Sequence, residues 1–238
     1  MESLRVGSLT DVGKVREINQ DCFSTDLDSG LFLVADGMGG HLAGEKASRR
    51  AVETICEQMA EAEEHSLETL QRAIQEANRQ IVSQSLQDPS MRGMGTTVTA
   101  VIAKEADLFF GHIGDSRAYL IRRNQIEQVT EDHSVVAQLL RARAITPQEA
   151  QRHPYRNVIT RCLGMQMEIE ADTRHVRWQK GDRILLCTDG LSGLVSDEEM
   201  AEIAGLAEDP QAACDQLVNL ALDRGGYDNV TVVLLANE

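Results

Sequence analysis

Aspartate is the residue type whose placement in this sequence could do chemistry. Four aspartates stand beside glycine or at the apparent ends of strands: Asp36 in VADGMGG, Asp115 in GHIGDSR, Asp189 in LCTDGL and Asp228 in GGYDNV. Because apolar runs flank each of them, the buried core would hold their backbones in place while their carboxylates emerge at a sheet edge. Crowded carboxylates raise each other's pKa unless cations intervene, and all-oxygen sites favour Mg²⁺ or Mn²⁺. Asp-Gly is also a common turn, and spacing alone does not bring the four together.

The elements that must position these aspartates change in kind along the chain. The apolar patterns predict strands at 31–35, 96–103, 108–113, 118–122, 125–129, 169–176, 183–187 and 230–235. Helical spacing predicts one helix around 51–59 and a second that begins after Ser66 as N-cap and ends at Asp88-Pro89. It also predicts shorter helices near 135–140 and after Thr146, and a C-terminal pair after Ser196 and over 210–223. Helices segregated from many strands favour an α+β fold in layers over βαβ alternation.

Composition and charge exclude several classes of protein. Of 238 residues, 23 are Lys or Arg and 38 are Asp or Glu, which gives a net charge of −15. This charge argues against nucleic-acid partners and anionic membranes, and a phosphate-bearing substrate would need a local source of positive charge. With only 4 Pro and scattered Gly, residues 1–238 are predicted to form one domain, with a monomer as the default.

The five cysteines are widely spread and contain no CxxC pair, so neither a disulfide framework nor a thiolate zinc site is indicated. The first residues lack the apolar core of a signal peptide, and no apolar run could cross a bilayer. We therefore expect a soluble, reduced, cytoplasmic protein.

Two other classes of enzyme are excluded by their motifs. A cysteine-based phosphatase needs Arg six positions after its thiolate, and no cysteine here has one. A P-loop kinase or NTPase needs the motif GxxxxGK[ST], which is absent.

Seven ordered motifs resemble the metal-dependent protein serine/threonine phosphatases of type 2C (the PPM family) in their short bacterial form. They are Gly13-x-x-Arg16-x-x-Asn19-Gln20-Asp21, Val34-Ala35-Asp36-Gly37-Met38-Gly39-Gly40, Gly95-Thr96-Thr97, Gly111-His112-Ile113-Gly114-Asp115-Ser116-Arg117, Asp132-His133-Ser134, Cys187-Thr188-Asp189-Gly190-Leu191 and Gly226-Tyr227-Asp228-Asn229-Val230-Thr231. The resemblance covers nearly the whole chain. It implies a four-layer α-β-β-α sandwich of two central antiparallel sheets flanked by helix pairs, with metals in a cleft at one end.

The resemblance also implies an activity, the hydrolysis of phosphoserine and phosphothreonine on proteins. Asp36 would bridge two Mg²⁺ or Mn²⁺ ions, with the Gly37 carbonyl on one ion and with Asp189 and Asp228 on the other. Asp21 would hold metal-bound waters. Two such ions turn water into hydroxide at neutral pH for in-line attack, without a covalent phosphoenzyme.

The remaining roles concern a third ion, the phosphate and the leaving group. Bacterial members often hold a third, weaker ion, which Asp115 with Asp189 would bind. Arg16 would clamp two phosphate oxygens, although it could also form an ordinary salt bridge. Met38 stands where many relatives place a His, so His41 is the candidate general acid. A proton from metal-bound water is an equal alternative.

Residues 134–161 correspond to the family's flap, a mobile segment beside the cleft. Four arginines make it more basic than the rest of the chain, and a solvated charged face is the simpler explanation: Arg141, Arg143, Arg152 and Arg156. A catalytically dead scaffold that binds phosphoproteins is the rival function, but Asp36, Asp189 and Asp228 are all present.

Overall fold

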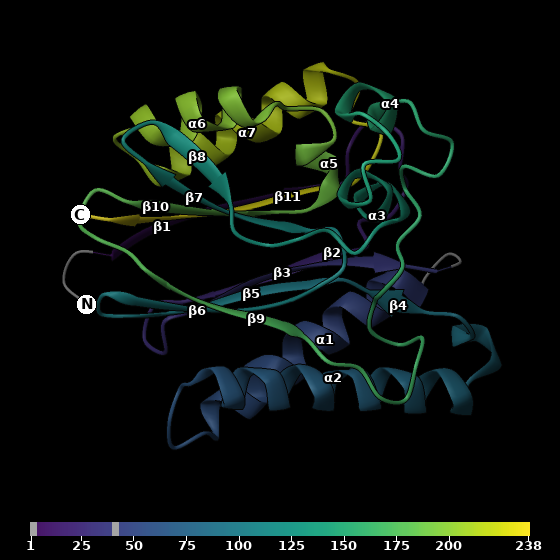
Figure 1. Cartoon of the computed structure of the whole chain (residues 1–238). Helices are drawn as coiled ribbons and strands as arrows, with labels where there is room; N and C mark the ends of the chain where they lie inside the picture. Colours follow the sequence, from purple (N-terminus) through teal and green to yellow (C-terminus); the bar gives the residue numbers. More distant parts are fainter. Residues whose placement is uncertain (1–3, 40–42) are drawn as a thin grey trace.

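The computed structural model describes residues 4–39 and 43–238. In these ranges two antiparallel sheets lie face to face and each carries a helix pair on its outer side (Figure 1). One sheet has the order β1 (Leu4–Asp11), β11 (Val230–Asn237), β10 (Arg183–Cys187), β7 (Arg117–Arg122), β8 (Gln125–Gln128). The other has the order β2 (Asp21–Asp26), β3 (Leu31–Met38), β5 (Val98–Lys104), β6 (Asp107–Ile113), β9 (Asp172–Arg177), and β4 (Gly95–Thr96) pairs with β3. The predicted α-β-β-α sandwich is confirmed.

The helices cover the outer faces of the two sheets. The sheet that holds β3 is covered by α1 (Ala43–Ala60) and α2 (Leu67–Gln87), and the other sheet by α6 (Asp197–Leu206) and α7 (Pro210–Asp223). Shorter helices are η1 (Pro89–Met91), α3 (Val135–Arg141), α4 (Pro147–Gln151) and α5 (Asp189–Ser192). Ser66 caps α2 by accepting from the Thr69 amide, and Ser196 and Glu199 form the predicted capping box of α6.

Strand β3 is buried on both faces because it lies between two apolar layers. Leu31, Leu33 and Ala35 pack toward α1 and α2, while Phe32 and Val34 pack toward the other sheet. This alternation explains why the LFLVA run is continuously apolar instead of alternating with polar residues. The strand therefore leads from a rigid core directly to Asp36.

Two strands were not predicted, β1 and β2. Their side chains are mostly half-buried and their sequences, LRVGSLTD and DCFSTD, hold no apolar run. The strand predicted at 169–176 lies instead at Asp172–Arg177, since the residues before it belong to a loop. The predicted hairpin turn at Arg123 and Asn124 is present, with φ of 50° and 61°.

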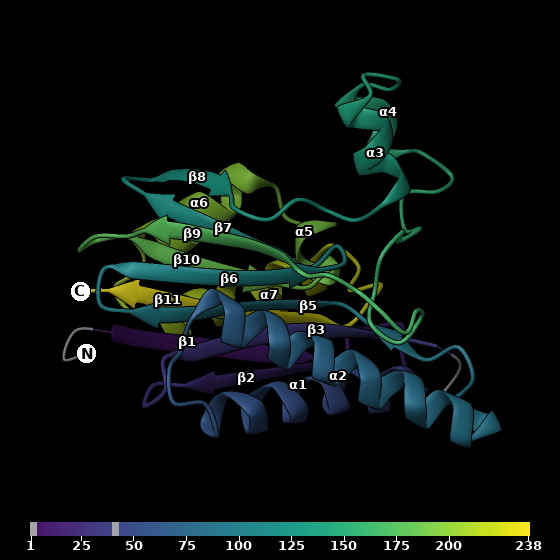
Figure 2. The same cartoon turned by 60° about the horizontal axis from the view of Figure 1, so that its bottom comes forward.

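The flap carries α3 and α4 and projects from one end of the sandwich (Figure 2). Both helices are largely exposed, with Ala150 as the buried residue of α4 and none in α3. Among the described residues no helix is long and apolar enough to span a membrane.

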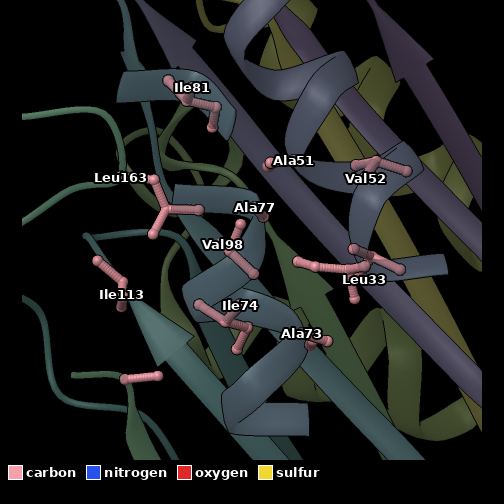
Figure 3. Close-up of a cluster of buried hydrophobic side chains, with 14 of the residues drawn as sticks. Leu33, Ala51, Val52, Ala73, Ile74, Ala77, Ile81, Val98, Ile113 and Leu163 are labelled. Atoms are coloured by element: carbon pink, nitrogen blue, oxygen red, sulfur yellow. The ribbon is translucent and has the colours of Figure 1, made fainter. Parts of the chain in front are cut away.

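We predict that the packing of α2 against the sheet contributes strongly to stability. Ile74 is fully buried beside Val98 (Figure 3), and a Cβ at Gly111 would lie 2.7 Å from its Cδ1 atom. Ile74→Ala should lower the free energy of unfolding by about 2–5 kcal/mol, because it leaves a cavity. Leu86→Ala is the control on the same helix: Leu86 is 76% exposed, and its loss should cost less than about 0.5 kcal/mol. Equal urea midpoints for the two variants would contradict this packing.

Candidate metal centre

Asp36 and Asp21 face each other at one end of the sheet. Asp36 follows the buried run of β3, and the strand register places Asp21 of β2 directly opposite. The Asp36 backbone is fixed by Thr97, whose amide donates to the Asp36 carbonyl at 2.9 Å and whose Oγ1 accepts from the Asp36 amide at 2.9 Å. The two carboxylates thus have a defined backbone spacing.

The Asp21 carboxylate is bound from the opposite sheet. Its Oδ2 atom accepts hydrogen bonds from Thr188 Oγ1 at 2.9 Å and Thr231 Oγ1 at 2.6 Å. Its Oδ1 atom is buried and has no hydrogen-bond partner in the described part of the chain. A buried oxygen of this kind costs free energy unless a ligand or water meets it, so one side of Asp21 is available for binding.

Asp189 and Asp228 are brought together by two chain segments that touch. Asp189 opens α5 after β10, and Gly190 lies so close to the carbonyl of Asn229 that no side chain would fit there. Asp228 Oδ1 accepts from the Asn229 amide at 2.9 Å, and its Oδ2 accepts from Arg16 Nη2 at 2.7 Å.

The loop that carries Arg16 is held by Asn229. The Asn229 side chain donates to the carbonyls of Val12 and Ile18 and accepts from the amide of Gln20. Arg16 itself is half exposed and forms a salt bridge with Asp228. The structure thus shows the salt bridge that the sequence allowed for Arg16, while the phosphate clamp stays a prediction.

The electrostatics join these aspartates into one cluster. Burial, then the charges of Asp21 and Asp189, raise the pKa of Asp36 well above its ordinary value. Burial raises the pKa of Asp21 to about 7, and burial with the charge of Asp228 raises the pKa of Asp189. Asp36 and Asp189 each influence the pKa of the other. Without a cation the cluster therefore retains protons.

Asp115 lies in the turn between β6 and β7 and is 8% exposed. Burial, then the charge of Asp189, raise the pKa of Asp115 to about 7, so this carboxyl belongs to the same electrostatic group. Its Oδ1 atom, like that of Asp21, is buried without a hydrogen-bond partner among the described residues.

The donor set fits hard cations. Within residues 4–39 and 43–238, no three His, Cys, Asp or Glu side chains already form a compact metal-binding group. The cluster nevertheless offers carboxylate oxygens whose repulsion a divalent ion would relieve, and two buried oxygens that lack partners. Gly37 belongs to this end too: its amide donates to the Gln20 carbonyl at 3.1 Å, and a Cβ would strike the carbonyl of Gly44.

The sequence reasoning assigned no role to the hydroxyl groups around the aspartates, those of Thr97, Thr188 and Thr231. The signal was available, because each of these threonines is part of one of the seven motifs, in GTT, CTDG and DNVT. The predicted general acid His41 lies outside the described residues.

Comparison with known proteins is consistent with this geometry. The sequence profile described as protein phosphatase 2C matches residues 14–234. The serine/threonine phosphatase stp of Listeria monocytogenes is 39% identical over 96% of this chain and 94% of its own length. The crystal structure of the Mycobacterium tuberculosis serine/threonine phosphatase PstP is 39% identical and superposes with a TM-score of 0.92 over 99% of both chains. The catalytic domain of a phosphatase PstP in complex with two manganese ions is 37% identical, with a TM-score of 0.90 over 98% of both chains. The chain that forms this aspartate cluster therefore belongs to the protein phosphatase 2C family.

Proposed function

We propose that this protein is a serine/threonine phosphatase that removes phosphate from phosphoserine and phosphothreonine of proteins with the help of Mg²⁺ or Mn²⁺. The observation that carries the proposal is the convergence of Asp21, Asp36, Asp189 and Asp228 at one end of the sandwich, from four separate segments. Relatives that share its length and fold are named as phosphatases, and one is described with two manganese ions.

In this proposal Asp36 would help to hold both ions, the Gly37 carbonyl would hold one of them, and Asp189 and Asp228 would hold the other. Asp21 would act through water, for which its Oδ1 atom is suited because it lacks a hydrogen-bond partner among the described residues. When bound, the two ions supply a hydroxide nucleophile at neutral pH and neutralise charge on the phosphoryl oxygens.

Asp115, together with Asp189, is proposed to hold a third, weaker ion. The buried Oδ1 of Asp115 supports this role, because it lacks a partner in the part of the chain that the structure describes. Arg16 supplies a guanidinium fork for the phosphate and so a positive charge beside the carboxylates. That local charge matters because the net charge of the chain is −15.

The thiols of this chain are unsuited to nucleophilic attack on phosphate. This property favours water as the nucleophile over a cysteine that would form a phosphoenzyme. Burial raises the pKa of Cys187 and Cys214 to about 12 and that of Cys162 to about 11. Burial also raises the pKa of Cys22 and Cys56. A reactive thiol needs the opposite shift.

The test of the function is phosphate release from a phosphothreonine peptide. We expect turnover with Mn²⁺, none with excess EDTA, and recovery when Mn²⁺ is restored.

Asp189→Ala should abolish turnover, because it removes a proposed ligand, whereas Asp115→Ala should only weaken it. Circular dichroism should show that both variants are folded. A clean wild-type preparation that binds phosphopeptide but is inert with Mn²⁺ would favour the scaffold, and wild-type rates in Asp189→Ala would refute the site.

The raised pKa values predict how the metal-free protein responds to pH. Between the ordinary carboxyl pKa near 4 and about 7, the native state binds more protons than the unfolded state, so the free energy of unfolding falls as pH rises. Saturating Mn²⁺ should remove this fall, because the cation replaces the protons. Thermal midpoints from pH 4.5 to 7.5, with EDTA and with Mn²⁺, measure the effect. Parallel curves in the two conditions would show that these carboxyls do not bind the ion.

The role of His41 can be tested through the leaving group. If His41 protonates the leaving alkoxide, His41→Ala should lower turnover of phosphothreonine peptide about 100-fold or more. It should leave p-nitrophenyl phosphate nearly unaffected, because nitrophenolate leaves without a proton. Equal losses on both substrates would exclude the acid role and leave water as the donor.

A further inference from the structure

A ring of hydrogen bonds leads from the backbone of Asp21 back to one oxygen of its carboxylate. Thr10 of β1 and Thr231 of β11 lie directly opposite each other in the strand register, and their Oγ1 atoms are 2.7 Å apart. Thr231 Oγ1 lies 2.6 Å from Asp21 Oδ2. Asn19 closes the ring, because its Nδ2 lies 2.9 Å from Thr10 Oγ1 and its Oδ1 lies 3.1 Å from the Asp21 amide nitrogen.

The hydrogen bonds of this ring can run in one direction only. The Asp21 amide can only donate, so the Asn19 atom beside it must be the carbonyl oxygen, and the atom beside Thr10 must be the amide nitrogen. Asn19 therefore donates to Thr10. The Thr10 hydroxyl in turn donates to Thr231, and the Thr231 proton is left for Asp21 Oδ2. A backbone amide thus sets the direction of every bond up to the carboxylate.

A second threonine occupies the same carboxylate oxygen. Thr188 Oγ1 accepts from the Thr231 amide at 3.0 Å, and its own proton goes to Asp21 Oδ2 at 2.9 Å. Oδ2 therefore receives two donors, one for each of its lone pairs, and has no room for an ion. Oδ1, in contrast, is buried and has no hydrogen-bond partner in the part of the chain that the structure describes.

We infer that Thr10, Asn19 and Thr231 are positioning residues: their one-way ring keeps Asp21 Oδ2 occupied by protein donors and reserves Oδ1 for the ion or its water. Asp21 then acts through a single oxygen atom, and strands β1 and β11 determine where that atom lies. The inference rests on the proposed function only in giving Oδ1 an ion to act on.

Two substitutions separate the hydrogen bond of Thr231 from its packing. Thr231 is fully buried, so its methyl group could matter as much as its hydroxyl. Thr231→Val keeps the branched shape and removes the hydroxyl, whereas Thr231→Ser keeps the hydroxyl and removes the methyl group. A positioning role requires a defective Val variant and a normal Ser variant, and a packing role requires the reverse.

Calorimetric titration with Mn²⁺ measures the effect without turnover. For Thr231→Val we expect roughly tenfold weaker binding of Mn²⁺, the size of effect typical of residues that orient a metal site, and for Thr231→Ser binding within about twofold of wild type. With phosphothreonine peptide, Thr231→Val should lower kcat and leave KM unchanged, because Asp21 binds no part of the peptide in the proposal.

Thr10 tests whether the ring acts as a unit. Thr10→Val removes the donor to Thr231, and we expect roughly threefold weaker binding of Mn²⁺. Combined with Thr231→Val it should cause no further loss, because the connection to Asp21 is already broken. Losses that multiply in the double variant would show independent effects and would refute the ring.

Thr54→Val is the matched control. Thr54 of α1 is buried, and its hydroxyl donates to Gln80 Oε1 of α2 at 3.0 Å, within the helix layer. Its substitution should leave the affinity for Mn²⁺ within about twofold of wild type. A loss as large as that of Thr231→Val would mean that removal of any buried hydroxyl weakens the site, and the inference would be wrong.

The inference is overturned if Thr231→Val binds Mn²⁺ like wild type, or if Thr231→Ser binds it as weakly as Thr231→Val. Should Thr231→Val fail to fold, the half-buried Thr10 on edge strand β1 decides instead: Thr10→Val should bind Mn²⁺ more weakly than Thr10→Ser, and equal affinities would refute the ring.

Failure of the proposed function looks different from failure of this inference. It would appear as a wild-type protein that binds Mn²⁺ without releasing phosphate, and the titrations would still report on the ring. A wild-type protein that binds no Mn²⁺ would overturn both.

Discussion

The rest of the structure depends on repulsion among carboxylates that the fold keeps close together. Burial and mutual charge raise the pKa of Asp21, Asp36, Asp115 and Asp189, so each destabilises the others when ionised. The three apolar layers, two between helices and sheet and one between the sheets, stabilise the arrangement by burial. A divalent cation would relieve this repulsion, and for that reason this end of the sandwich is the proposed metal site.

The two sheets contribute different halves of the cluster, and hydroxyl groups join them. Asp21 and Asp36 come from one sheet, while Asp189 and Asp228 flank strands of the other. Thr188 and Thr231, on the side of the second sheet, donate hydrogen bonds to Asp21 of the first. The packing of one sheet on the other therefore also determines where the Asp21 carboxylate lies. A core substitution that shifts one sheet against the other would thus disturb the centre from a distance.

Sequence patterns predicted the layered α+β fold because the buried strands and amphipathic helices have strong periodicity, as in LFLVA and in α2. They missed β1 and β2, because these strands are half-buried and polar, and long-range pairing with β11 and β3 decides their conformation. The aspartates were found through their motifs, whereas their convergence depends on close approaches such as Gly190 to Asn229 that no local pattern encodes. Asn229 and the three threonines stand in the motifs, but their hydrogen bonds were not predicted, because their partners lie far away in the sequence.

The flap and the metal centre differ in how firmly they are held, and this difference has a consequence for function. Helices α3 and α4 bury almost no side chains, so the free energy that holds the flap in place is concentrated at its base. The metal end is fixed by many buried hydrogen bonds to backbone atoms of β3 and β11. A substrate or partner that contacts the flap would act on the aspartate cluster through contacts such as those at the base of the flap, where the bonds of His133 lead directly to the turn that carries Asp115. Arg143, Arg152 and Arg156 are exposed on the flap, whereas two hydrogen bonds join the buried residues His133 and Gly114.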